Sequence, residues 1–225
     1  ELAPFFNISL DAYRNTGGYQ SLARVLRDMT PEEVSELVKE SGLSGRGGAF
    51  FPTGLKWEFV RKDPKTPRYI VINGDESEPG TYVNRHSLEL DPHLMLEGMI
   101  IAAYACNAEL GYVYIRGEYG LAHDRTQSAI REAYKAGYLG SDILGKTGFN
   151  FNVTFRRGAG AYIVGEETAL SNSLEGKRGT PRYKPPFPTN VGVWGMPTAI
   201  NNVETLSAVP SIVEQGAEWF QSLGR

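Results

Sequence analysis

The sequence predicts an α/β protein in which helices flank a parallel sheet. Three short apolar runs, at residues 69–73, 112–116 and 151–155, are rich in β-branched and aromatic side chains, as buried strands are. Helical patterns separate these runs from one another. Strands that alternate with helices favour parallel pairing with right-handed crossovers, so we expect a single parallel sheet.

Residues 1–40 are expected to form a helical arm ahead of this sheet. Thr30 suits an N-cap, Pro31 suits the first helical position, and Glu33 completes a capping box. Apolar residues then recur at helical spacing. We therefore predict two units, a helical arm and an α/β domain over residues 41–225.

Two more helices follow from the pattern between the strands. An apolar helix opens at Asp91 and runs to about Cys106, and residues 121–136 form an amphipathic helix. Asn201 or Asn202 can cap a further helix. Cys106 is the single cysteine and is expected in the core, which excludes a disulfide or a four-cysteine cluster within this chain.

Composition excludes several classes of protein. A net charge of −3 over 225 residues gives no broad basic surface for nucleic acid. The longest apolar segment, residues 94–106, contains Glu97 and is too short to span a bilayer, so we expect membrane contact only through partners. The 26 glycines exceed the usual share of about 7% and gather in a few loops.

The densest glycine segment is Ser41–Trp57, which contains five glycines. Successive N–H groups in such a segment form an anion site, to which Arg46 and Lys56 add positive charge. Phe51 and Trp57 are expected to supply flat apolar walls. A phosphate joined to a planar ring fits these features, although a flexible basic surface loop is the alternative, because the spacing is not G-x-G-x-x-G.

Unusual loops follow each predicted strand. The first is the acidic loop at residues 73–80, and two others follow the second and third strands at residues 117–120 and 156–167. Ligands of parallel sheets bind outside the carboxyl ends of the strands, so we expect the three loops to form one site. The acidic loop is either a solvated turn or a set of acceptors for ribose or ribityl hydroxyls.

Two further pairs of residues have both a structural and a functional interpretation. Glu166 and Glu167 either complement a helix dipole or hydrogen-bond a cofactor. Lys184 and Phe187 lie either in a solvated basic loop or at a ligand, as a phosphate contact and a stacking wall.

No catalytic constellation is visible in the sequence. His86, His93 and His123 lack metal-ligand spacing, and we interpret all three as structural, with no obvious partner for His93. No serine, cysteine or histidine grouping indicates a nucleophile. Ligand-like loops without such a grouping fit chemistry carried by a bound cofactor.

Together these motifs resemble one family, the NADH-binding, FMN-containing flavoprotein subunit of respiratory complex I, with relatives in NAD-linked hydrogenases and formate dehydrogenases. The motifs that carry the resemblance are residues 41–57, 73–80, 158–170, 172–179 with 184–188, and 194–205. The resemblance implies an atypical Rossmann-like domain that holds FMN deep in a cavity, with NADH stacked on its ring. It also implies hydride transfer from NADH to FMN, for which no protein acid or base is required.

The resemblance assigns two sets of residues. FMN would contact Gly45, Arg46, Gly47, Lys56, Asn73, Asp75, Glu76, Tyr162, Gly165, Glu166, Asn201, Asn202 and Thr205. The dinucleotide would contact Phe51, Phe59, Glu78, Glu167, Lys184 and Phe187.

The family passes electrons through iron–sulfur clusters, finally to a quinone in a larger complex. Its 4Fe-4S cluster is held in a C-terminal region that this chain lacks, and its expected partner is a thioredoxin-like 2Fe-2S subunit. The resemblance thus implies a soluble arm on the cytoplasmic or matrix side, and this chain alone would act only as a diaphorase. The alternative is an NAD-reducing subunit of a hydrogenase or formate dehydrogenase.

One departure from the family bears on the substrate pocket. The family usually has glycine where this chain has Phe50, and a phenyl group there would narrow the dinucleotide pocket or displace Phe51. A further alternative is therefore an FMN-binding scaffold with a blocked pocket. The cysteines common in the family near Tyr82 and Val164 are also absent.

Overall fold

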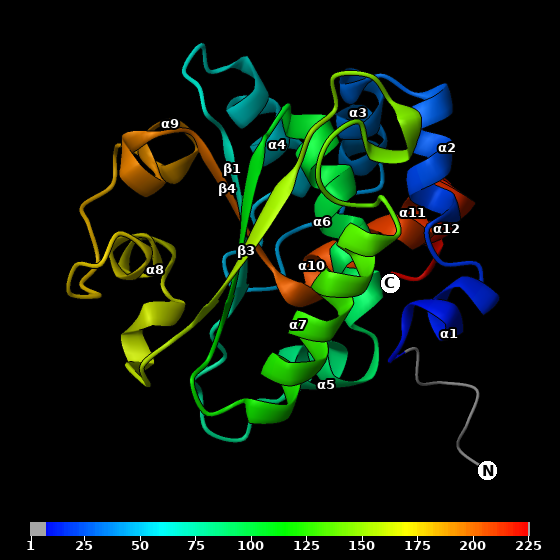
Figure 1. Ribbon diagram of the computed structural model, residues 1–225. Helices are drawn as coiled ribbons and strands as arrows, with labels where there is room; N and C mark the ends of the chain where they lie inside the picture. The colour runs from blue at the N-terminus through cyan, green and yellow to red at the C-terminus, as the bar shows by residue number, and fades with distance from the viewer. Residues whose placement is uncertain (1–7, 225) are drawn as a thin grey trace.

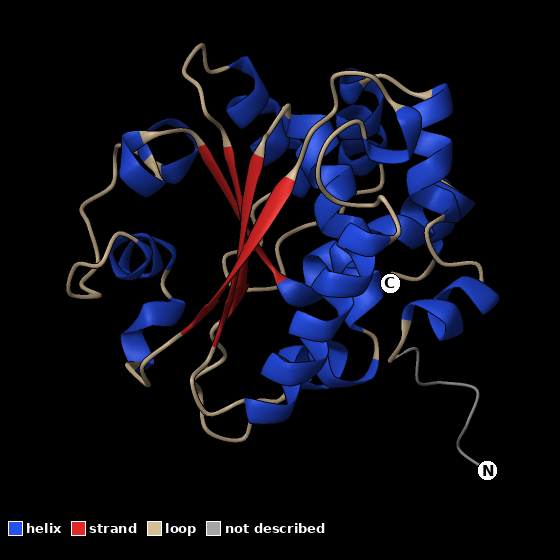
Figure 2. Ribbon diagram, viewed as in Figure 1, coloured by secondary structure: helices blue, strands red, loops and turns tan. Residues whose placement is uncertain are grey.

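The computed structural model describes residues 8–224, which form a four-stranded parallel sheet between two unequal layers of helices (Figures 1 and 2). The strands are β1 Tyr69–Gly74, β2 Leu110–Ile115, β3 Asn152–Arg157 and β4 Thr198–Asn202. Their order is β3-β2-β1-β4, and every neighbouring pair is parallel. The predicted α/β class and parallel pairing are confirmed.

The helices before β2 are α1 Leu10–Asn15, α2 Gln20–Asp28, α3 Pro31–Glu40, α4 Thr53–Lys62, α5 Val83–Leu90 and α6 Pro92–Cys106. Among them, α3 and α6 lie close to the predicted positions, and α1 and α2 lie in the segment expected to be helical. The sequence did not indicate α4 or α5. The residue that precedes each of these helices, Pro52 or Tyr82, makes no side-chain cap hydrogen bond. Such a capping residue is the sequence signal that marks the start of a helix.

The remaining helices follow β2. They are α7 Gly120–Lys135, α8 Glu167–Leu174, α9 Pro188–Val191, α10 Val203–Ser207, α11 Val209–Gln215 and α12 Ala217–Ser222. Short 3₁₀ turns lie at Tyr162–Gly165 and Val193–Gly195. Asn202 caps α10 through its side chain, as one of the two predicted alternatives.

Alternate residues of β1 serve the two faces of the sheet, as the period of a strand requires. Ile70 and Ile72 belong to the main core, on the side of α6 and α7. Tyr69 and Val71 belong to a smaller cluster on the side of α8. In Figure 1, the short helices α8 and α9 lie on that second side together with loops and short turns, whereas the longer helices cover the other side.

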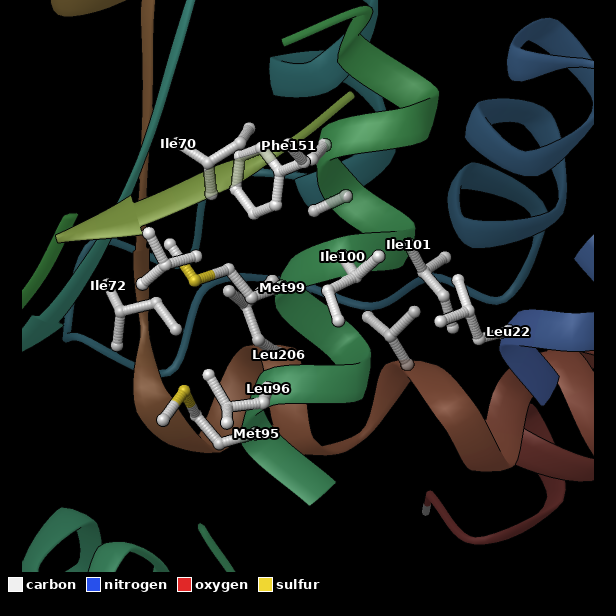
Figure 3. Packing of buried hydrophobic residues seen from close by; sticks show 14 of the residues in the cluster. Leu22, Ile70, Ile72, Met95, Leu96, Met99, Ile100, Ile101, Phe151 and Leu206 are labelled. Atoms are coloured by element: carbon white, nitrogen blue, oxygen red, sulfur yellow. The ribbon is translucent and has the colours of Figure 1, made fainter. Parts of the chain in front are cut away.

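Helix α6 is the centre of the main core and is buried almost all round. Figure 3 shows its side chains packed between β1 and residues of α2 and α10. Gly98 of α6 lies where a Cβ would meet the carbonyl oxygen of Leu206 at 2.0 Å, so only glycine allows α10 to pass. Cys106 at the end of this helix is fully buried, as expected.

The N-terminal helices share this core. The predicted capping box at Thr30 and Glu33 is present, and Leu22 and Val34 belong to the main cluster. The predicted division of the chain after residue 40 stays a prediction. The first seven residues of the predicted helical arm lie outside the described part of the chain. Within residues 8–224, no helix combines the length and apolar character that a bilayer crossing needs.

His93 has the partners that the sequence did not reveal. Its ring is fully buried, with Nδ1 3.0 Å from the Tyr19 hydroxyl and Nε2 3.3 Å from Glu132 Oε2. Burial lowers its pKa, against the opposing effect of Glu132. Glu97, one turn along α6, accepts the backbone N–H groups of Tyr19 and Leu22 at 2.9 Å each. These buried side chains fasten the start of α2 to α6.

Candidate functional site

Two adjoining cavities lie beside β4 at the open edge of the sheet. The larger, which we call the outer cavity, has a volume of about 670 Å³. The smaller, the inner cavity, has a volume of about 250 Å³. Six residues line both cavities and form the waist between them: Ala49, Phe51, Lys56, Glu167, Lys184 and Ile200.

The inner cavity gathers most of the residues that the resemblance assigned to FMN. Its remaining lining residues are Gly45, Gly47, Asn73, Gly165, Glu166, Asn201 and Asn202. They come from the glycine segment, from the ends of β1 and β4, and from the turn before α8. The strand-end argument is matched by residues of the first and third loops, whereas residues 117–120 line neither cavity, and contact of the lining with FMN stays a prediction.

The outer cavity gathers the assigned dinucleotide residues, except Glu78. Phe51, Phe59 and Phe187 all line it, together with Glu167 and Lys184. The rings of Phe51 and Phe59 lie 6.4 Å apart, centre to centre, and tilted by 46°. All three rings are about half exposed, which leaves apolar faces open to the cavity.

The sequence missed a second set of outer-cavity residues. These are Lys62, Asp63, Pro64, Pro188, Thr189, Asn190 and Thr198. They lie at the end of α4, in α9 and at the start of β4, and neither α4 nor β4 was expected. Asp63 and Asn190 contact each other across the cavity rim, with Nδ2 of Asn190 3.2 Å from Oδ2 of Asp63.

The glycine segment is fixed at both ends by hydrogen bonds. Gly45 N–H donates to the carbonyl of Phe51 at 2.9 Å, and Arg46 N–H donates to the Thr205 hydroxyl at 2.9 Å. At Gly45 and Gly47 the backbone is not left-handed, and an added Cβ would find its nearest neighbour at an ordinary 3.6 Å. The protein's own packing therefore does not explain these two glycines, whereas a ligand lying against the backbone would.

Trp57 was wrongly expected to line a ligand site. It lies in α4, is fully buried, and belongs to the main core. The expectation failed because the last part of the glycine segment, from Thr53 on, belongs to α4, which directs Trp57 into the core.

Phe50 lines neither cavity. It adopts φ +53°, the left-handed region that favours glycine, and its side chain is 65% exposed. Its backbone thus explains why glycine suits this position. Its neighbour Phe51 still faces both cavities, so the expected narrowing of the pocket is not found.

Lys56 supplies a positive charge at the waist. Its Nζ donates to the carbonyl of Ile200 at 2.7 Å. Burial lowers the pKa of Lys56, an effect that the carboxylate of Glu167 opposes. The lysine therefore holds its place by one backbone acceptor and keeps donor capacity for an anion in the cavity.

Glu166 has the structural role that the sequence left open, at the start of α8, while contact of Glu166 and Glu167 with a cofactor stays a prediction. Glu166 caps α8, because its Oε2 accepts the N–H groups of Thr168 and Ala169 at 2.9 Å each. Its Oε1 lies 2.9 Å from Nζ of Lys184, and Glu167 Oε1 lies 2.6 Å from the same atom. Burial would lower the Lys184 pKa, but the two carboxylates outweigh it and raise that pKa.

Asp75 is a buried carboxylate with unused hydrogen-bonding capacity. It follows β1 and is 8% exposed, and its Oδ2 has no hydrogen-bond partner among residues 8–224. Burial raises its pKa to about 6, in spite of Arg116 nearby. Asp75 lies directly behind the inner cavity, since a Cβ on Gly165 would meet its carbonyl oxygen at 2.8 Å.

Other assigned residues lie outside both linings, where they hold the structure around the cavities. Glu76 accepts the N–H groups of Asn84 at 3.1 Å and Arg85 at 3.2 Å, and so caps α5 from a distance. Tyr162 donates to the carboxylate of Glu78 across the strand-end loops. Arg46, Asp75 and Thr205 complete the set outside the linings.

A glycine-lined cavity at the carboxyl ends of a parallel sheet is the arrangement of nucleotide-binding α/β domains. The chain belongs to the family described as the Nuo51 FMN-binding domain, whose model matches residues 38–211. This confirms the family that the sequence motifs resemble.

Curated relatives among the F subunits of NADH-quinone oxidoreductase are close in sequence. The F 2 protein of Rhizobium meliloti (strain 1021) is 56% identical over 96% of this chain and 51% of its own length. The F protein of Aquifex aeolicus (strain VF5) is 53% identical over 96% of this chain and 50% of its own. The F protein of Escherichia coli (strain K12) is 51% identical, with 96% and 48% covered. The chain spans about half the length of the curated relatives it matches.

Solved structures agree with this family. A chain of the NAD⁺-reducing [NiFe]-hydrogenase in the H₂-reduced state superposes with a TM-score of 0.81 and is 38% identical. The match covers 93% of this chain and 35% of that chain. The hydrogenase relatives named with the sequence resemblance are thus also structural neighbours.

Proposed function

We propose that this chain binds FMN in the inner cavity and NADH in the outer cavity, and that hydride passes from NADH to FMN at the waist. The observation that carries the proposal is the shared wall of the two cavities, formed by residues such as Phe51, Lys56 and Lys184. Two planar ligands that enter from the two sides can meet face to face only at such a boundary.

The residues of the inner cavity fit FMN. The room left by Gly45 and Gly47 has no use within the protein, which supports a ligand lying on their backbone. Asp75, which lies behind the lining, offers an unused buried acceptor for ribityl hydroxyls, and Lys56 in the lining offers charge for the phosphate. When bound, FMN supplies a ring that accepts a hydride.

The outer cavity fits a dinucleotide. Its volume of about 670 Å³ lies within the range usual for small-molecule sites. Phe51, Phe59 and Phe187 supply faces for stacking, and Lys184 supplies a charge for a phosphate. Glu167 adds a negative charge that disfavours an additional phosphate, so we infer a preference for NADH over NADPH.

The protein's part in the reaction is to position the two ligands. The aromatic walls restrict the dinucleotide to one plane, while the glycine segment holds the other ligand against it. No side chain at the waist is needed to move a proton. Closing the waist with Phe51 and Ile200 keeps water from the reacting faces.

We further propose that the chain works within a larger electron-transfer assembly. Its relatives are named as components of NADH-quinone oxidoreductase, and this chain, with Cys106 alone, cannot hold a four-cysteine cluster. Electrons would leave through iron–sulfur clusters beyond this chain, including a thioredoxin-like 2Fe-2S subunit, and reach a quinone. The chain would stand in a soluble arm on the cytoplasmic or matrix side.

One observation favours a second candidate, the reverse direction. The NAD⁺-reducing hydrogenase shares this fold at 38% identity. The same cavities would then bind NAD⁺ and reduced FMN. Reduction of NAD⁺ by the chemically reduced flavoprotein at a rate above NADH oxidation would favour this candidate.

The proposed binding of FMN is tested by filling the inner cavity. Gly47→Leu keeps an allowed backbone but places a side chain in the cavity, and we expect a folded protein without flavin absorbance after reconstitution. Gly120→Leu is the matched control, because an added Cβ there meets nothing within 4 Å. Flavin retained in Gly47→Leu at the wild-type level would contradict the proposal.

A further inference from the structure

Arg182 joins two segments on the second side of the sheet, the C-terminal end of α8 and the turn that follows α9. Its Nε donates to Oδ1 of Asn172 at 2.8 Å, its Nη1 to the carbonyl of Gly192 at 3.0 Å, and its Nη2 to Oε1 of Glu175 at 2.7 Å. The guanidinium thus binds the segment that precedes its own loop and the segment that follows it.

Glu175 is the buried counter-ion of Arg182. Its side chain is 4% exposed, and the Oε1 that binds Arg182 also accepts the Trp194 N–H at 2.8 Å. Burial would raise the pKa of Glu175, but Lys177 and Arg182 outweigh it, so the pKa is lowered and the carboxylate is charged. The ion pair between Arg182 and Glu175 holds the middle of the loop of residues 176–187 against the end of α8.

Apart from the ion pairs of Lys184 with Glu166 and Glu167, residues 183–187 are exposed where the loop reaches the outer cavity. Tyr183 is 97% exposed and Phe187 is 54% exposed, so no buried apolar side chain anchors the segment between them. Lys184 lies in that segment and lines both cavities. The last firm anchor before Lys184 is therefore Arg182, two residues earlier.

A second route connects Arg182 to the same lysine. The backbone N–H of Arg182 donates to the Thr168 hydroxyl at 2.8 Å, and that hydroxyl donates to Oε2 of Glu166. The other oxygen of Glu166 lies 2.9 Å from Nζ of Lys184. A chain of contacts therefore leads from Arg182 through Thr168 and Glu166 to Lys184 at the waist.

We propose that Arg182 is a positioning residue for the dinucleotide, which holds Lys184 at the waist through its fixed guanidinium and through Thr168. This inference rests on the proposed function of the outer cavity. Arg182 touches neither cavity, and its effect is exerted on the geometry of the lysine that lines both.

The test compares Arg182→Gln with Arg178→Gln, both reconstituted with FMN. Arg178 lies on the same loop, is exposed, and its guanidinium makes no hydrogen bond or ion pair among the described residues. We expect Arg182→Gln to keep its FMN and to raise KM for NADH ~10-fold, because one to two hydrogen bonds that order Lys184 are lost. The value of kcat should stay within about twofold of the wild type. Arg178→Gln should leave both constants unchanged.

A purely structural role would lower thermal stability without this separation of KM from kcat. Thr168→Val provides the second variant, because it removes only the hydroxyl link and leaves every charge in place. We expect a smaller rise in KM from it, and Thr168→Ser, which keeps the hydroxyl, should restore the wild-type KM. An unchanged KM in Thr168→Val, or in a folded Arg182→Gln, overturns the proposal.

The assay separates this inference from the proposed function. If NADH fails to bleach the flavin of the wild-type protein, the proposed function fails. If NADH bleaches the wild type and the variants have its KM, only the positioning role of Arg182 is overturned.

Discussion

The backbone N–H of Arg46 donates a 2.9 Å hydrogen bond to the side chain of Thr205, a residue 159 positions further along the chain. Thr205 is buried at the first turn of α10, directly after β4. The contact therefore fixes the glycine segment against the end of the sheet. Thr205 acts on the inner cavity through this segment, since it does not line the cavity itself.

Thr205→Val should weaken FMN binding while leaving the fold intact. The substitution keeps the shape of the side chain and removes the acceptor of the Arg46 N–H, which frees the glycine segment. One hydrogen bond contributes about 1 kcal/mol, so the FMN dissociation constant should rise ~5-fold. Fluorescence titration with FMN measures it. Thr205→Ser keeps the acceptor and should bind normally, and equal affinity in Thr205→Val would contradict the role.

Asp75→Asn should change how the stability of the FMN-free protein depends on pH. Burial raises the pKa of Asp75 to about 6, above its usual value of 3.8, so the folded state binds more protons than the unfolded state between these pH values. Stability is therefore lost as pH rises through this window, by up to about 3 kcal/mol. Urea unfolding at several pH values should show this slope in the wild type and a flatter profile in Asp75→Asn. Identical slopes would contradict the argument.

The same substitution should weaken FMN binding at neutral pH. Asparagine replaces one acceptor oxygen with a donor, and the charged acceptor for ribityl hydroxyls is lost. An FMN dissociation constant unchanged in Asp75→Asn would show that the unused Oδ2 faces no ligand.

Phe50→Gly should leave the affinity for NADH within about twofold of the wild type, because the phenyl group lines neither cavity. Glycine also relieves about 1 kcal/mol of left-handed strain at φ +53° while it increases the entropy of the unfolded chain by a similar free energy. The net change in stability should therefore be small. Isothermal titration of the FMN-loaded protein with NADH under anaerobic conditions checks this. A tenfold gain in affinity would restore the blocked-pocket alternative.

Glu97→Ala should destabilise the protein without affecting its site. It leaves the buried N–H groups of Tyr19 and Leu22 and the Tyr13 hydroxyl without an acceptor, which costs roughly 3 kcal/mol or more. Thermal unfolding should show the loss, with KM for NADH unchanged at temperatures where the variant is folded. Glu214→Ala, at an exposed acid, is the control. Equal stability of the two variants would contradict the anchoring of α2 by Glu97.

Sequence patterns were sufficient for three of the four strands, for helices α3, α6 and α7, and for part of the candidate site. The alternation of apolar runs with helical periods is set by the periods of the elements themselves, so the parallel sheet could be predicted. The strand-end rule placed Asn73 and Gly165 together before any contact was known, whereas Asn202 was assigned to the site only by the family resemblance.

What could not be predicted depended on contacts between distant residues. Strand β4 is short, and its two asparagines indicated only a helix cap. Helix α5 is capped by Glu76, eight positions away from Asn84, so no local signal marked its start. The resemblance assigned Glu76 and Thr205 to FMN; in the fold both accept backbone N–H groups, and their contact with FMN stays a prediction.

The most direct test of the account is an anaerobic titration of the FMN-reconstituted protein with NADH, followed through the visible absorbance of the flavin. The adjoining cavities predict that the flavin band is bleached as NADH is added, reaching completion at one NADH per FMN. The Gly47→Leu protein should show no flavin band to bleach. Bound flavin that stays oxidised in the presence of excess NADH would contradict the account.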